Sequence, residues 1–271
     1  MSTSTATIRD RFSSEAGNWD RLYETSGATS VYEHNLWHRR ETALAFIGSP
    51  EGRILDVGCG PGNVTTALPQ TADVVGTDFA IPMLRTAKDA AREADKPVAL
   101  TASDATSLPF PDGTFNTVLA LGLMEYIADT GSILEEVGRV TAPEGTLVLS
   151  LPNAWSPFII IDDALKASKN TLTQVLMPPA IRRRLKALLG KEDIPYFTHR
   201  RHRFKPSQII KSINALGFHL ESWRYHTYGF GVLNHAKLNL SLCKKLESFT
   251  RTHPNLEKLG WTIVMKAKKR S

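Results

Sequence analysis

The chain has 271 residues, 42% of them hydrophobic and 22% charged, so it is long and apolar enough to bury a sizeable core. It has no run of roughly 20 apolar residues and no apolar segment after its polar start, so neither a membrane-spanning helix nor a secretory signal is expected. Cys59 and Cys243 are too few for a disulfide framework or a metal-binding cysteine cluster, which favours a cytoplasmic protein without a metal site.

Positive charge is in excess, because 33 Lys and Arg residues against 27 Asp and Glu residues leave a net charge of +6. The excess gathers at residues 182–186, 200–205 and 266–270. Such clusters suit anionic partners, namely lipid head groups, acidic substrates or nucleic acid, and they are equally typical of a solvated surface.

The first 50 residues have a mostly helical pattern with several aromatic side chains, and we predict an N-terminal helical cap over residues 1–50. Residues 51–271 form the main domain, in which short apolar runs alternate with helical patterns. The first predicted strands cover residues 54–57, 74–78, 98–102, 115–121 and 146–151. The helices predicted between them cover residues 82–93 and 132–140.

This alternation predicts parallel strands with crossover helices, and hence a Rossmann-like, doubly wound α/β sheet. A helix over residues 206–216, a strand from residue 218 and a strand over residues 261–267 follow, which gives seven strands. Residues 237–249 also have apolar side chains at helical spacing.

Residues 154–200 interrupt this rhythm, and we predict a helical insertion there. Two prolines, Pro178 and Pro179, open a segment whose apolar residues at 181, 185, 188 and 189 share one helix face. Basic residues between 182 and 186 fill much of the remaining surface of that predicted helix.

A glycine-rich loop, LDVGCGPG over residues 55–62, directly follows the first predicted strand. Glycines let the backbone turn tightly and approach a ligand closely, and the N-terminus of a following helix attracts anionic groups. A dinucleotide fingerprint G-x-G-x-x-G that starts at Gly58 would need a glycine where Asn63 stands, which weakens a nicotinamide interpretation.

Two carboxylates follow the next two predicted strands. Asp78 ends the second strand, where a carboxylate can accept hydrogen bonds from ribose hydroxyls, and Asp104 follows the third. Ligands of open α/β sheets bind outside the carboxyl ends of the strands, so three consecutive strands present suitable groups at one edge.

With these motifs in order, residues 53–151 resemble the class I S-adenosylmethionine-dependent methyltransferases, particularly the group that contains ubiquinone and menaquinone methyltransferases. The segments that carry the resemblance are LDVGCGPG, GTDFAIPML from Gly76, SDATSLPFPDGTFNTVLALGLMEYIAD from Ser103 and EVGRVTAPEGTLVLSLPN from Glu136. The resemblance implies an enzyme that uses S-adenosyl-L-methionine as its cofactor.

The resemblance also implies which residues bind this cofactor. Gly58 and Gly60 would face its methionine part, and Asp56 would orient the glycine loop. The ribose would be held by Asp78. The remaining contacts would be Met83 under the adenine, Asp104 and Ala105 at the adenine edge, and the backbone carbonyl of Leu121 toward the methionine amine.

Methyl transfer depends mainly on in-line alignment, and an oxygen, nitrogen or carbon acceptor can also need a base. The family often has Glu-His where this chain has Glu125 and Tyr126, so that histidine's role cannot be carried over. The base candidates are His199 and His202, followed by Tyr126 and His34, and the first two are equally consistent with a basic surface loop.

The sequence of the insertion indicates what kind of substrate the enzyme binds and whether the protein contacts a membrane. In related enzymes this region covers the substrate, which favours a small, apolar organic molecule. The apolar run at residues 158–161 and the basic helix near 181–189 suit peripheral contact with an anionic membrane, although helices that only pack on the domain would show the same stripes. The basic clusters leave RNA methylation as the alternative function. The acceptor atom and the oligomeric state stay open.

Overall fold

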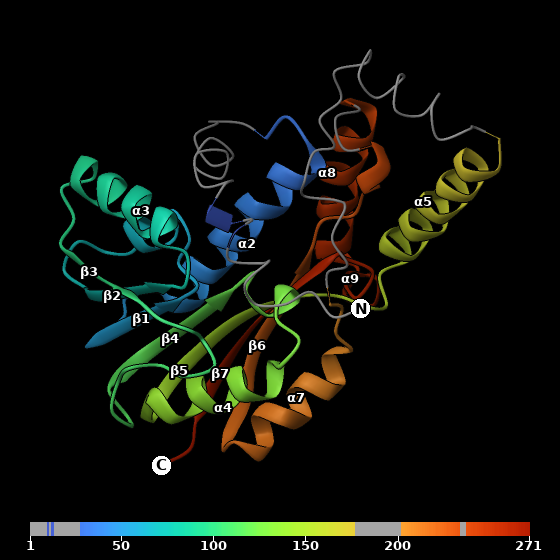
Figure 1. Ribbon diagram of the computed structural model, residues 1–271. Helices are drawn as coiled ribbons and strands as arrows, with labels where there is room; N and C mark the ends of the chain where they lie inside the picture. The colour runs from blue at the N-terminus through green and yellow to red at the C-terminus, as the bar shows by residue number, and fades with distance from the viewer. Residues whose placement is uncertain (1–9, 11, 14–27, 177–201, 234–236) are drawn as a thin grey trace.

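The structure is a computed structural model that describes residues 10, 12–13, 28–176, 202–233 and 237–271 (Figure 1). Seven strands form one sheet in the order β3-β2-β1-β4-β5-β7-β6. Their bounds are β1 (Arg53–Val57), β2 (Asp73–Asp78), β3 (Val98–Ala102), β4 (Phe115–Leu121), β5 (Thr141–Pro152), β6 (Phe218–His226) and β7 (Thr262–Lys269). This arrangement confirms the predicted Rossmann-like fold class.

The sheet is mixed, because β7 is antiparallel to both of its neighbours while β1 to β5 pair in parallel. The predicted strands over residues 98–102 and 115–121 have the observed bounds. The turn expected at residues 143–145 instead lies inside β5 as an irregularity, where Glu144 has a φ of 57° and the pairing with β4 shifts register.

Helices cover both faces of the sheet. Those of the described residues are α2 (Val31–Ile47), α3 (Ile81–Glu93), α4 (Thr130–Val140), α5 (Pro157–Leu176), α7 (Pro206–Ala215), α8 (Lys237–Thr252) and α9 (Pro254–Glu257). Short 3-10 turns are η1 (Thr65–Ala67), η2 (Met124–Tyr126) and η4 (Gly231–Leu233). Figure 1 shows α4 and α7 on one face of the sheet, and α2, α3 and α8 on the other.

The predicted helices begin where the sequence supplies suitable N-terminal groups. In α4, the carboxylate of Asp129 accepts a hydrogen bond from the backbone N–H of Ser132 at 3.1 Å, which caps the first turn. In α3, Pro82 occupies the first turn, where its missing N–H costs nothing. The buried residues of α3, Met83, Ala87 and Ala91, follow at intervals of four and form one face.

The core consists of two apolar layers, one on each side of the sheet. Side chains alternate along a strand, so β4 sends Val118 into the layer under α4 and α7 and sends Leu119 into the layer under α2. Both residues are fully buried, which accounts for the nearly continuous apolar character of this central strand.

The insertion begins with α5, and the helix expected at residues 181–189 lies outside the described residues. Phe158 and Ile159 at the start of α5 pack against a buried cluster that includes Val31 and Leu240. Within the described part of the chain, no helix combines the length and the hydropathy that crossing a bilayer requires.

Candidate functional site

The glycine loop after β1 needs its glycines for backbone conformation. Gly58, Gly60 and Gly62 all have positive φ, at 71°, 54° and 88°. A Cβ on Gly58 would lie 2.9 Å from Cδ1 of Leu123, whereas one on Gly60 would meet no atom within 4 Å. The loop therefore combines tight packing at Gly58 with open space beside Gly60.

A full helix does not follow the glycine loop, which corrects the expectation of a helix N-terminus there. The chain forms only the 3-10 turn η1, and its next residue, Leu68, is extended. Because Pro69 follows, helical geometry at Leu68 is disfavoured, and the turn ends there.

Asp78, the last residue of β2, links this loop to the start of α3. Its Oδ2 accepts a hydrogen bond from the backbone N–H of Gly60 at 3.0 Å, and its Oδ1 accepts one from Ala80 at 2.8 Å. Burial raises the pKa of the Asp78 carboxyl, and these backbone hydrogen bonds oppose the rise. The carboxylate thus holds the loop while it borders the hollow described below.

Asp56 in β1 is a second buried carboxylate beside the loop. Its Oδ2 accepts a hydrogen bond from the hydroxyl of Thr65 at 2.6 Å. Burial raises the pKa of Asp56 from 3.8 to about 6, and nearby Asp78 adds to the rise, while the Thr65 hydrogen bond and the charge of Arg39 oppose it. The carboxylate is therefore mostly ionised at neutral pH.

A hollow opens at the carboxyl ends of β1, β2 and β4. It brings together six of the eight residues predicted to bind the cofactor: Asp56, Gly58, Gly60, Asp78, Met83 and Leu121. The other lining residues are Phe12, Arg39, Cys59, Pro61, Asn63, Val64, Phe79, Gly122, Leu123, Tyr126 and Ile127. Most of the lining residues are apolar, and the charged ones are Arg39, Asp56 and Asp78.

The two predicted adenine-edge residues do not line this hollow. The Oδ1 of Asp104 accepts hydrogen bonds from the backbone N–H of Thr106 at 2.9 Å and from its hydroxyl at 2.7 Å. Ala105 is buried in the core layer on the α4 side. Both residues follow β3, which neighbours β2, so they lie farther along the same edge of the sheet.

Sequence reasoning missed Arg39, which α2 places in the hollow. A Cβ on Gly122 would lie 2.1 Å from Nη1 of Arg39, so the guanidinium lies against the backbone at the end of β4. No periodic pattern marks this residue, since α2 buries the polar side chains His34, Asn35 and Thr42 and has no apolar stripe. Phe12 was also missed, and its ring centroid lies 5.0 Å from that of Tyr126.

The predicted base candidates have different positions. The backbone N–H of His202 donates to the carbonyl of Glu125, the residue before Tyr126, at 2.8 Å, but the side chain of His202 is exposed and does not line the hollow. His199 lies outside the described residues. His34 does not line the hollow, because its Nε2 is 2.8 Å from Oε2 of Glu247.

Taken together, the hollow offers two carboxylates, one guanidinium, backbone N–H groups and an apolar wall. Such a donor set can hold a ligand that carries cationic, anionic and hydroxyl groups beside an apolar ring.

Comparisons with known proteins identify the family of this chain. Residues 55–149 match a family described as a methyltransferase domain. The chain is 32% identical over 227 residues to a demethylmenaquinone methyltransferase of Streptomyces avermitilis, which covers 79% of this chain and 88% of the relative. A protein of the same name from Streptomyces griseus is 30% identical, over 84% of this chain and 94% of the relative.

Solved structures show the same fold. The crystal structure of magnesium protoporphyrin IX methyltransferase from Synechocystis PCC 6803 with bound SAH has a TM-score of 0.63, covers 99% of this chain and 100% of its own, and is 16% identical. The fold, the ordered motifs and the two full-length relatives lead to one conclusion: the chain belongs to the class I S-adenosylmethionine-dependent methyltransferases, in the group of ubiquinone and menaquinone methyltransferases.

Proposed function

We propose that this enzyme transfers the methyl group of S-adenosylmethionine to a quinone-like small molecule bound in the hollow at the carboxyl edge of the sheet. The observation that carries the proposal is this hollow, which combines two carboxylates and a guanidinium with apolar and aromatic side chains. The names of the Streptomyces relatives supply the substrate class and favour a small molecule over RNA.

The residues of the hollow fit the charges of this cofactor. Asp78 would accept from the ribose hydroxyls, and the guanidinium of Arg39 would pair with the carboxylate of the methionine part. The carbonyl of Leu121 would accept from the ammonium group. Asp56 would keep the loop in place through Thr65, and the buried side chain of Met83 would lie under the adenine.

Two predicted contacts remain part of the proposal although the residues lie outside the hollow. Asp104 and Ala105 follow β3, the strand next to the one that ends in Asp78. An adenine that extends from the ribose along this edge would pass toward them. When bound, the cofactor supplies an electrophilic methyl group on a sulfonium that leaves as a neutral thioether.

The apolar wall is suited to an aromatic ring as the methyl acceptor. Phe12, Phe79 and Tyr126 pack edge to face, with Phe12 5.0 Å from Tyr126 and 6.1 Å from Phe79 between ring centroids. A planar substrate that packs on these rings would be held in a fixed orientation. Fixed orientation is the main source of rate in such a transfer.

Two further assignments concern the covers of the hollow. Residues 1–50 would act as an N-terminal cap, since Phe12 and Arg39 reach the hollow from this segment, and residues 51–271 would form the methyltransferase domain. Residues 154–200 would cover the substrate and touch the membrane surface. Ile160 and Ile161 of α5 support that contact because they are 50% and 44% exposed.

The test of the proposed function is incubation of the purified protein with methyl-labelled S-adenosylmethionine and, in separate reactions, demethylmenaquinone, a polar lipid extract and total RNA. We expect label in the quinone and little in the other two fractions. Label in RNA, or label in no fraction while the cofactor binds, would contradict the proposed substrate class.

We further propose that His202 or His199 serves as the base for the acceptor. Loss of a general base lowers turnover about 100-fold or more, so His202→Ala should do so while cofactor affinity stays unchanged. His253→Ala is the matched control, since His253 is an exposed histidine at the start of α9. Normal turnover in His202→Ala, His199→Ala and the double variant would show that neither histidine is the base. Catalysis would then rest on alignment of the acceptor with the methyl group.

A further inference from the structure

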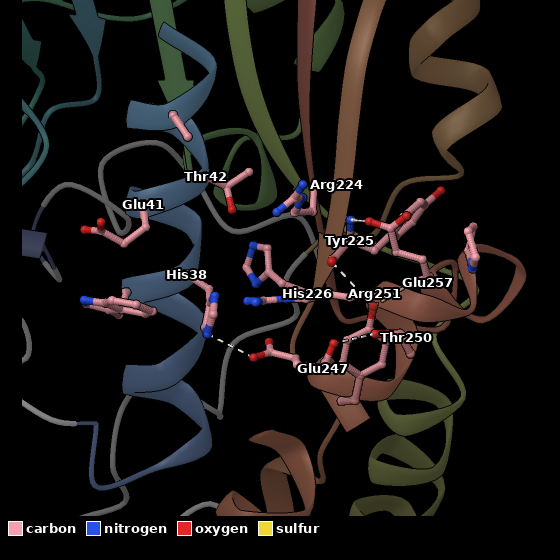
Figure 2. A pocket seen from close by; sticks show the side chains of 14 residues that line it. His38, Glu41, Thr42, Arg224, Tyr225, His226, Glu247, Thr250, Arg251 and Glu257 are labelled. Atoms are coloured by element: carbon pink, nitrogen blue, oxygen red, sulfur yellow. Dashed lines mark hydrogen bonds and ion pairs between the residues drawn. The ribbon is translucent and has the colours of Figure 1, made fainter. Parts of the chain in front are cut away.

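A second cavity of about 560 Å³ lies between α2, β6, α8 and α9, apart from the hollow at the glycine loop. Its lining includes His38, His226 and Glu247, and none of its lining residues belongs to the glycine loop. Figure 2 shows His38 on α2, Glu247 on α8 and His226 at the end of β6 gathered at one part of this cavity. A fourth residue, His34, contacts Glu247 from one turn earlier in α2.

The contacts in this cluster converge on a single oxygen atom. The Nε2 of His34 lies 2.8 Å from Oε2 of Glu247, and the Nε2 of His38 lies 2.9 Å from the same oxygen. Residues four apart on a helix share one face, which is why two histidines of α2 reach one carboxylate of α8. The three side chains are 5%, 16% and 8% exposed.

We propose that His34, His38 and Glu247 form a binding site for one zinc ion. Two imidazoles and one carboxylate are a donor set that zinc prefers, with bonds of about 2.0–2.2 Å. Tetrahedral geometry at that bond length separates ligand atoms by roughly 3.3–3.5 Å. The two nitrogens therefore need to move outward from Oε2 by only about 0.5 Å, and the ion takes the place of the protons between these atoms.

The surroundings of the cluster have two features that an ion site needs. Glu247 is oriented by a second contact, because its Oε1 accepts a hydrogen bond from the backbone N–H of Thr227 at 2.8 Å. The cavity gives the ion a route, since His38 and Glu247 both line it.

His226 supplies a further nitrogen beside the cluster. Its Nε2 is buried and, among the residues that the structure describes, has no hydrogen-bond partner. Its Nδ1 lies 3.0 Å from the hydroxyl of Thr227, which fixes the ring, and the ring centroid is 6.1 Å from that of His38. This nitrogen lies outside the group of three ligands, and it can serve as the partner of a water molecule in the fourth position.

The site would join two segments that lie 213 residues apart in the sequence. Zinc binding at these residues ties α2 to α8 and so fixes the N-terminal helix on the sheet. It needs no residue of the glycine loop, so zinc binding and cofactor binding can be measured separately.

The test is a zinc titration of the untagged protein after treatment with a chelator, read by competition with a chromophoric zinc indicator. We expect one zinc ion per chain and an increase in Tm on zinc addition. His38→Asn should lower the affinity by more than the roughly 10–100-fold that loss of an outer contact causes, and should abolish the Tm increase. Glu247→Gln should lower it similarly.

His219→Asn is the matched control, because His219 is an exposed histidine 3.9 Å from Glu221 and lies outside the cavity. It should bind zinc like the parent. If Glu247→Gln fails to fold, the His38→Asn variant alone tests the proposal. His38 lines the cavity, so its replacement is expected to leave the fold intact. The proposal is overturned if the parent binds no zinc at micromolar concentrations, if His38→Asn binds as well as the parent, or if His219→Asn loses as much affinity.

Discussion

Two carboxylates, Asp56 and Asp78, both hold the glycine loop and line the hollow. Asp78 accepts hydrogen bonds from Gly60 and Ala80 and also lines the hollow, while Asp56 holds Thr65 and borders the same space. These contacts shape the loop, and both carboxylates also border the space in which we propose that the cofactor binds. Substitutions here therefore affect both stability and binding, and the two effects need separate measurements.

Asp78→Asn should weaken S-adenosylmethionine binding, because the amide keeps one acceptor oxygen and loses the second together with the charge. A lost hydrogen bond from buried hydroxyls costs about 1–3 kcal/mol, or roughly 5–150-fold in Kd. Isothermal titration calorimetry measures the change, with circular dichroism as the check of folding. Asp73→Asn, at the exposed opposite end of β2, should bind like the parent. Equal affinity in both variants would remove Asp78 from the cofactor site.

Asp56→Asn should change how stability depends on pH. Because the folded-state pKa of Asp56 is raised from 3.8 to about 6, this group favours the folded state below pH 4, and that contribution is lost as the pH rises through 6. The amide does not ionise. The unfolding free energy of the parent should therefore fall by about 2 kcal/mol relative to Asp56→Asn between pH 4 and pH 7. Urea unfolding at both pH values measures it, and parallel pH profiles would show that Asp56 keeps an ordinary pKa.

The sequence predicted those site residues that depend only on local position. Gly58 and Asp78 follow strands whose apolar runs are unmistakable, and parallel strands bring their carboxyl ends to one edge. Arg39 and the pair His34 and Glu247 could not be found in this way, because tertiary packing of α2 places them. The sequence signal that could have pointed to this cluster is the four-residue spacing of His34 and His38, which places both on one helix face.

At the scale of elements, agreement did not depend on burial alone, because β3, whose residues are half-buried or exposed, was also predicted with its observed bounds. β4 has both faces covered and was predicted with its observed bounds. β5 begins at Thr141, earlier than predicted. The expected turn at residues 143–145 is part of the strand, and the pairing with β4 shifts register there. In α5 the apolar run at residues 158–161 is divided, with Phe158 and Ile159 packed inward and the next two isoleucines exposed.

This division of α5 predicts which residues touch a membrane. Replacing Ile160 and Ile161 together by serine should weaken binding to anionic vesicles by about 2 kcal/mol, or roughly 30-fold, since each half-exposed side chain gains about 1 kcal/mol on burial. Vesicle sedimentation measures the binding. Leu256→Ser, an exposed leucine in α9, is the control. A parent protein that stays in the supernatant with anionic vesicles at low salt would leave α5 as a cover of the substrate alone.

At the scale of the whole molecule, α2 connects the two cavities. Arg39 lines the hollow at the glycine loop, and His38, the residue before it, lines the second cavity. Asn35 fixes the helix, since its Nδ2 donates to the hydroxyls of Thr227 at 3.2 Å and Thr262 at 2.8 Å. A ligand in either cavity should therefore stabilise the docked position of α2.

Cofactor binding should slow amide hydrogen exchange in α2. A ligand that contacts Arg39 stabilises the state in which α2 is docked, and so reduces the local opening through which exchange occurs. Exchange followed by mass spectrometry with and without S-adenosylhomocysteine measures this change. Peptides from α7, on the opposite face of the sheet, serve as the internal reference (Figure 1). Equal protection of α2 and α7 would mean that the helix is not part of the cofactor site.

The position of β7 has a consequence for synthesis on the ribosome. β7 follows β6 in the chain but lies between β5 and β6, so β6 cannot join the sheet before β7 has emerged. Roughly 110 residues separate the end of β5 at Pro152 from the start of β7 at Thr262, which corresponds to roughly 5–20 s of translation. During that interval the nascent chain can hold β1 to β5 paired while the outer edge of β5 is bare. A bare strand edge invites pairing with other chains, so conditions that slow elongation over this stretch should favour aggregation over folding.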